Sequence, residues 1–321
     1  MKEPSISLKE TSRIEVLTLM DNYTDVLLRN TDVVVRPPLS KTGEIPTDTV
    51  LAEHGLSMLV KVYQGENTYT VLFDTGYSQV GVPHNIEILG VKVKDIETIV
   101  LSHGHMDHTG SLDILLEQMA RPISVVVHPD AFLTPRYFAL EDGRKLLFPQ
   151  TITKEALRNK GVDILESTKP TLLGDDTLVV TGEVERVTDF EKGLPNAFME
   201  KDGEVVQDAI LDDQALVMNL KDKGLVIVAG CSHAGIINTV IYAKKITGIE
   251  RVHAVLGGFH LSGAFFEPII EKTIEEFKAI DPKVLVPMHC TGWKAIQRFE
   301  EEFPSSFVLN SVGSKFIFAS D

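Results

Sequence analysis

The sequence has few cysteines, a single tryptophan and no long apolar run. Its two cysteines, Cys231 and Cys290, allow at most one disulfide, and a cytoplasmic chain with its own core has little need of one. No segment approaches the roughly 20 apolar residues that span a bilayer, and the first residues lack the apolar stretch of a signal peptide. We therefore expect a cytoplasmic protein with free thiols.

Basic residues are also in deficit. Lys and Arg number 31 against 46 Asp and Glu, which gives a net charge of −15. Binding to a phosphate backbone needs a basic stripe, so we expect neither nucleic acid nor a membrane as a partner. The glycine patterns that bind dinucleotides or nucleotide phosphates are absent from the sequence. These absences direct attention to small-molecule chemistry, and they leave a homodimer open.

Apolar spacing predicts an early sheet followed by strand-helix units. Residues 13–20 alternate as a half-buried strand does, and residues 56–63 and 68–73 have the composition of a hairpin. Later segments alternate between the two periodicities. We expect strands at 97–101, 123–127, 177–181, 215–220, 225–229, 251–256 and 283–286, helices at 111–119, 235–246, 268–280 and 293–303, and two short strands within 307–318.

Residues 130–176 lose clear periodicity and are rich in aromatic residues. We interpret this range as an insertion, or lid, within a single domain that covers residues 1–321. The aromatic side chains of this range, such as Phe132, Tyr137, Phe138 and Phe148, either stack on a planar substrate ring or form a small core of their own. The remaining elements predict an α/β (α+β) fold with two sheets stacked between helices.

A cluster of metal-ligand residues follows the strand at 97–101. Within six positions the chain has His103, His105, Asp107 and His108. Neutral imidazole nitrogens and carboxylate oxygens suit zinc, iron and manganese, and a loop lets neighbouring side chains converge where a strand would separate them. The pattern therefore predicts a metal site at this strand end.

The motifs around this cluster resemble those of the metallo-β-lactamase superfamily. The resemblance begins with Leu72-Phe73-Asp74-Thr75-Gly76 and continues with Leu101-Ser102-His103-Gly104-His105-Met106-Asp107-His108-Thr109-Gly110. Four further segments are similar to the subgroup named for 7,8-dihydropterin-6-methyl-4-(β-D-ribofuranosyl)aminobenzene-5'-phosphate synthase. They are Ala52-Glu53-His54-Gly55-Leu56-Ser57, Gly230-Cys231-Ser232-His233-Ala234-Gly235, Leu256-Gly257-Gly258-Phe259-His260-Leu261 and Pro287-Met288-His289-Cys290-Thr291-Gly292.

The resemblance implies a four-layer αββα sandwich and a site for two divalent ions, zinc first, with manganese or iron as alternatives. It assigns His103 and His105 to one ion, and Asp107 and His108 to the other. His289 matches the last ligand of the family. Where the family has a bridging aspartate this chain has Cys231, so we expect His233 to complete the first site and leave Cys231 either as a ligand or as a packed thiol.

Three further residues are candidates for supporting or catalytic roles. Asp74 either caps its turn or orients a ligand histidine. His260 and His54 either serve the reaction, beside Asp107, by moving a proton or holding an anionic group, or are structural. The other histidines have no neighbouring ligand residues in sequence, and we interpret them as structural. They are His84, His128 and His253.

We expect a metal-dependent hydrolase, since two ions can activate water and stabilise charge on oxygen. The substrate is expected to be a small anionic molecule, such as a phosphoester, a cyclic phosphodiester or a pterin precursor. Two alternatives stay open: an iron-dependent redox or thiol enzyme, and a metal-containing binding protein without turnover.

Overall fold

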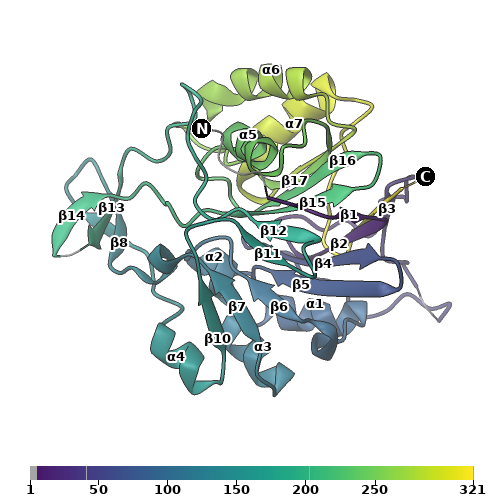
Figure 1. The fold of residues 1–321 in the computed structure, drawn as a ribbon. Coiled ribbons are helices and arrows are strands. Elements are labelled where there is room, and N and C mark those ends of the chain that lie inside the picture. The colour runs from purple at the N-terminus through teal and green to yellow at the C-terminus, as the bar shows by residue number, and fades with distance from the viewer. Residues whose placement is uncertain (1–5, 41, 202, 321) are drawn as a thin grey trace.

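The computed structural model describes residues 6–40, 42–201 and 203–320. Two β-sheets face one another in it, and helices cover the outer side of each sheet (Figure 1). The model therefore has the four αββα layers that the resemblance implied. No helix within the described ranges is both long and apolar enough to cross a membrane.

The first sheet is built mainly from the N-terminal half of the chain. In spatial order its eight strands are β10 (Asp163–Glu166), β7 (Ser124–Val127), β6 (Thr98–Val100), β5 (Asn67–Phe73), β4 (Ser57–Gln64), β2 (Arg13–Met20), β19 (Lys315–Ala319) and β3 (Val34–Val35). Strand β2 forms because its apolar residues alternate, so that one face enters the core. Helices α1 (Gly81–Leu89) and α3 (Leu112–Met119) cover the outer face.

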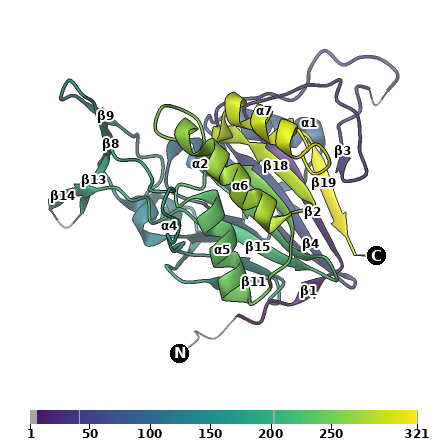
Figure 2. The same cartoon turned by 90° about the horizontal axis from the view of Figure 1, so that it is seen from above.

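The second sheet comes largely from the C-terminal half. Its main path runs through β11 (Thr171–Leu173), β12 (Leu178–Val180), β15 (Ala215–Leu220), β16 (Gly224–Ala229), β17 (Val252–Gly258) and β18 (Val284–Met288), and β1 (Glu10–Thr11) pairs with β15. Strand β16 at its centre has no polar side chain because both of its faces are buried. Figure 2 shows the helices that lie over this sheet, α5 (Ile236–Thr247), α6 (Ile270–Ile280) and α7 (Trp293–Glu302).

Three apolar clusters fill the spaces between these layers. One lies between the two sheets and joins Val60 and Val71 to Val228 and Leu256. The other two lie between each sheet and its own helices. In α3, Leu112, Leu115, Leu116 and Met119 are buried at the spacing of a single helix face.

A smaller sheet projects from one side of the sandwich (Figure 2). Its strands are β14 (Glu204–Gln207), β13 (Ala197–Lys201), β8 (Arg136–Ala139) and β9 (Lys145–Leu147). The range 130–176 is not one unit of the fold, because β10 joins the first sheet and β11 joins the second. That range also contains α4 (Lys154–Asn159) and all but the first residue of the short 3₁₀ helix η2 (Pro129–Phe132).

The chain end departs from the two short strands expected within 307–318. Only β19 is a strand there, and Phe307 forms an isolated bridge to Leu285 instead. The parallel strands matter most for the site. Strands β5 and β6 run parallel to one another, as do β16, β17 and β18, so the loops after them gather at one edge of the sandwich.

Candidate metal centre

Three histidines from two loops converge at this edge. His103 and His105 follow β6, and His233 follows β16. The His103 Nε2 atom lies 3.0 Å from His105 Nδ1 and 3.2 Å from His233 Nε2. We call this group the three-histidine cluster. Its ligand atoms all lie within 4.8 Å of one another.

The protonation of these rings fits a metal ligand set. Burial lowers the pKa of His103 and of His233 well below the ordinary value, and it lowers the pKa of His105 to about 4. Neutral imidazoles therefore face one another in a buried space. The nitrogens that converge are His103 Nε2, His105 Nδ1 and His233 Nε2. Converging neutral nitrogens are the donor set that zinc and related ions bind.

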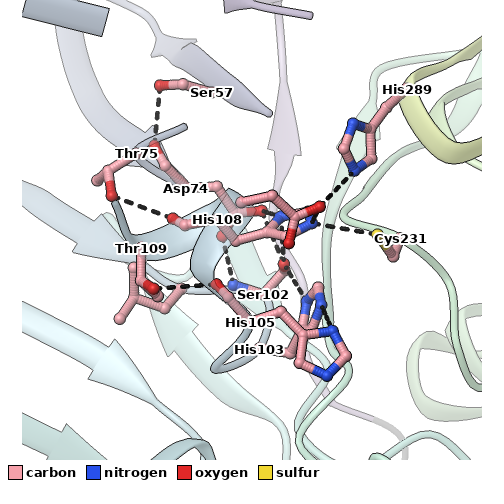
Figure 3. Close-up of polar contacts among 12 residues, drawn as sticks. Ser57, Asp74, Thr75, Ser102, His103, His105, His108, Thr109, Cys231 and His289 are labelled. Atoms are coloured by element: carbon pink, nitrogen blue, oxygen red, sulfur yellow. Dashed lines mark hydrogen bonds and ion pairs between the residues drawn. The ribbon is translucent and has the colours of Figure 1, made fainter. Parts of the chain in front are cut away.

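A second cluster lies beside the first and contains Asp107, His108, Cys231 and His289. His108 Nε2 lies 3.1 Å from the Cys231 sulfur and 3.6 Å from Asp107 Oδ2. His289 Nε2 lies 3.4 Å from the same carboxylate oxygen (Figure 3). We call this group the mixed cluster, since it combines imidazole, carboxylate and thiol.

Charge in the mixed cluster favours a cation. Burial by itself would lower the pKa of His108, but the carboxylates of Asp107 and Asp74 outweigh burial and raise this pKa to about 9. Burial also opposes ionisation of Asp107, yet His108 and His289 lower the pKa of that carboxyl below its ordinary value. The negative charge that favours a protonated imidazole would equally attract a divalent ion. Burial raises the pKa of the Cys231 thiol, which must lose its proton to bind a metal.

Asp74 occupies the position of a carboxylate that orients a ligand histidine. Its Oδ2 atom lies 2.6 Å from His108 Nδ1, and its two oxygens accept hydrogen bonds from the Ser102 backbone and hydroxyl at 2.7 Å each (Figure 3). With Nδ1 held by this carboxylate, Nε2 of His108 is the nitrogen that faces the mixed cluster. Asp74 has a φ of 61° at the end of β5, so a turn also depends on it.

The structure places His54 beside the mixed cluster and His260 beside His233 and Cys231. His54 Nε2 lies 3.7 Å from Asp107 Oδ2, and its ring stacks on His289 at 5.1 Å between centroids. The His260 ring lies 4.3 Å from the His233 ring, and Phe266 packs against it edge-on. Its ligand atom also groups with those of Cys231 and His233.

The remaining histidines lie elsewhere. His84 bonds to the Thr49 carbonyl, His128 accepts from the Asp130 backbone, and His253 packs against Phe318. Among the described residues, none of these three belongs to a group of metal-ligating side chains.

Two supporting residues, Asp21 and Asn22, did not stand out in the sequence. Asp21 Oδ1 accepts a bond of 2.9 Å from the His289 backbone, and Asn22 donates one of 3.0 Å to the His289 carbonyl. The position of Asp21 directly after the first strand was the available signal. Phe148, which follows β9, stacks on His105 at 4.7 Å between centroids. The small sheet therefore reaches the three-histidine cluster through an aromatic ring.

The second cysteine also lies at the site. Cys290 follows His289 directly and is buried, and its sulfur donates to the Cys231 carbonyl at 3.4 Å. Both thiols are free, so the sequence-based expectation of unbridged cysteines agrees with the structure. Neither cysteine is exposed to solvent in the described structure.

Comparisons with known proteins place this geometry in context. The sequence model of the metallo-β-lactamase superfamily matches residues 52–189. A relative from Methanocaldococcus jannaschii is 36% identical over 259 residues, which cover 80% of this chain and 87% of the relative. That protein is named 7,8-dihydropterin-6-methyl-4-(β-D-ribofuranosyl)-aminobenzene-5'-phosphate synthase. A shorter match of 68 residues, 37% identical, covers 21% of this chain and 23% of an N-acyl homoserine lactonase from Agrobacterium fabrum.

A solved structure is similar over nearly the whole chain. Tm1679, described as a metal-dependent hydrolase of the β-lactamase superfamily, superimposes with a TM-score of 0.72 at 26% identity. The alignment covers 96% of this chain and 100% of that protein. A metallo-β-lactamase fold protein from Bacillus subtilis, YhfI, superimposes with a TM-score of 0.50 at 11% identity. That alignment covers 96% of this chain and 100% of YhfI. This second similarity concerns the fold alone.

Proposed function

Because the chain belongs to the metallo-β-lactamase superfamily, we propose that it is a metal-dependent enzyme of the hydrolase type with a dinuclear site. The observation that carries the proposal is the pair of adjacent, buried ligand clusters. His103, His105 and His233 would hold one ion, and Asp107, His108, Cys231 and His289 the other. Zinc is the first choice for imidazole and thiolate ligands, with manganese or iron as alternatives.

Two divalent ions in such a site lower the pKa of water toward neutrality and stabilise charge on the attacked and leaving oxygens. The protein supplies the rest. Asp107 lies within reach of His54, His108 and His289, so its carboxylate can orient a donor at the mixed cluster. Burial, followed by the neighbouring His289, lowers the pKa of His54, so a neutral imidazole borders the cluster. A neutral ring favours accepting a proton over donating one.

His260 borders the three-histidine cluster. Its ring lies between His233 and Phe266, and its Nδ1 atom is buried without a hydrogen-bond partner in the described structure. A nitrogen free in this way can bond to a substrate oxygen. We propose that His54 and His260 act on the substrate, beside Asp107.

The substrate class is proposed from charge and from relatives. A site that holds two cations attracts an anionic group, so a phosphoester or cyclic phosphodiester suits it. The name of the M. jannaschii relative adds a pterin-precursor phosphate to the candidates. Phe148 beside His105 offers a ring face on which a planar group could stack.

The test is turnover of a chromogenic panel by protein loaded with zinc, manganese or iron. The panel contains a phosphodiester, a phosphomonoester, a lactone and a dihydropterin phosphate. We expect at least one substrate to be hydrolysed, and His103→Ala to abolish the activity. Bound iron without hydrolysis would point to redox chemistry that involves Cys231. A fully metal-loaded protein that turns over no member of the panel would favour a binding protein.

A further inference from the structure

A short segment before β15 contacts both loops that carry the three-histidine cluster. Gln214 donates its backbone N–H to the Ser102 carbonyl at 2.9 Å and its side-chain amide to the Leu101 carbonyl at 2.8 Å. Asp212 Oδ2 accepts from the Gly104 N–H at 2.8 Å. Asp213 Oδ2 accepts from the Ala234 N–H at 3.0 Å. The turn at residues 212–214 therefore forms hydrogen bonds with the residues on both sides of His103 and with the residue that follows His233.

Asp212 is fixed in place by a buried arginine. Arg136 donates to both carboxylate oxygens of Asp212, at 3.0 and 2.6 Å, and its Nε atom lies 3.1 Å from Asp208 Oδ2. Arg136 is 4% exposed, Asp208 2% and Asp212 0%. A two-pronged pair of this kind fixes the orientation as well as the position of the carboxylate. Arg136 begins β8, so the small sheet is joined to the metal-binding loop through this pair.

The loop is also packed closely against η2 at Gly104. A Cβ atom at Gly104 would lie 2.2 Å from the Ala131 carbonyl oxygen, so the backbone between His103 and His105 is pressed against Ala131. Asp212 accepts a hydrogen bond from the N–H of the same glycine. Gly104 is therefore held by a hydrogen bond and packed against backbone atoms of Ala131.

We propose that Asp212, oriented by Arg136, is a positioning residue that fixes the His103-Gly104-His105 loop and joins the small sheet to it. The proposal rests on the proposed function only in taking these histidines as metal ligands. Asp208 shares the same arginine but bonds to the Ile210 N–H and not to the metal-binding loop. Asp208 therefore provides a matched control.

The experiment compares Asp212→Ala, Asp212→Asn and Asp208→Asn in the full chain. Cobalt affinity is measured by titration of the visible spectrum, and the exchange rate of the Gly104 amide is measured by hydrogen exchange on metal-free protein. We expect Asp212→Ala to weaken cobalt binding roughly 10- to 100-fold, the usual effect of losing a residue behind a ligand. Asp212→Asn keeps an acceptor for the Gly104 N–H but turns its NH₂ toward the Arg136 guanidinium, so its affinity should lie between those of Asp212→Ala and the wild type.

Hydrogen exchange separates this proposal from the metal assignment. The Gly104 amide should exchange roughly tenfold faster in Asp212→Ala and unchanged in Asp208→Asn. Equal losses in Asp212→Ala and Asp208→Asn would show a general stabilising role and overturn the proposal, as would wild-type behaviour of Asp212→Ala. If wild-type protein binds no cobalt, the proposed function fails, and the exchange rates alone decide whether Asp212 holds the loop.

Discussion

Replacing Asp74 by asparagine tests how the mixed cluster is oriented. The substitution preserves shape, and asparagine tolerates the φ of 61° at this position. Its Oδ1 atom can still accept from the Ser102 N–H, but an amide NH₂ then replaces the oxygen that lies 2.6 Å from His108 Nδ1. Two donors cannot face one another, so His108 must move its proton to Nε2. The lone pair that faces Cys231 and Asp107 is thereby lost.

The loss can be stated as an affinity. Removing a partner of a ligand histidine costs roughly 10- to 100-fold in metal binding, or about 1.4 to 2.7 kcal/mol. Isothermal titration of metal-free Asp74→Asn should show one weakened site and one site near the wild-type affinity, since the three-histidine cluster does not include His108. Asp48→Asn is the control, because Asp48 Oδ1 lies 3.4 Å from Nε2 of His84, a histidine that belongs to neither cluster. Two unchanged sites in Asp74→Asn would refute the reasoning.

Three further predictions follow from single features of the structure. Gly104→Ala should cost about 1 to 3 kcal/mol of unfolding free energy and weaken metal binding, because its Cβ would meet backbone atoms of Ala131; chemical denaturation and metal titration check this. Burial raises the pKa of Glu191 to about 7, so its contribution to stability is present below its ordinary pKa and disappears as pH rises through 7. The free energy of unfolding of Glu191→Gln should therefore rise relative to that of the wild type by up to about 3 kcal/mol between pH 4.5 and 8. Chemical denaturation at several pH values measures this, and a constant difference between the two proteins would contradict it. Removing metal with a chelator should lower the melting temperature, because metal at 100-fold excess over its Kd contributes about 2.7 kcal/mol to the free energy of unfolding. The melting temperature of His103→Ala should fall less when the chelator is added.

Much of the fold and of the candidate site could be predicted because local patterns encode them. The strand at 13–20 and the helix at 111–119 have clear periodicity, and both agree with the structure to within about a residue. Six of the candidate ligands lie in segments that follow strands, so the resemblance could assign them to one edge: His103, His105, Asp107, His108, His233 and His289. The structure brings these residues together, while metal binding itself stays a prediction.

Other parts depend on contacts that no local pattern reveals. Asp212 lies 108 positions from Gly104, and Arg136 lies 76 positions from Asp212. Helix α1 was not expected, since its segment begins with Gly81 and has a proline in the first turn, where proline is tolerated. The extent of the small sheet was missed because β13 pairs with β8, about 60 positions earlier in the chain, and β14 joins the sheet only through β13.

The central claim is that the two clusters hold one metal ion each. Metal analysis of the purified protein, of His103→Ala and of His289→Ala tests it most directly, with hydrolysis of a chromogenic phosphodiester measured alongside. We expect two equivalents of divalent metal in the wild-type protein, a loss of about one equivalent in each variant, and no activity in either. Absence of bound metal from every wild-type preparation, or unchanged metal content in both variants, would contradict it.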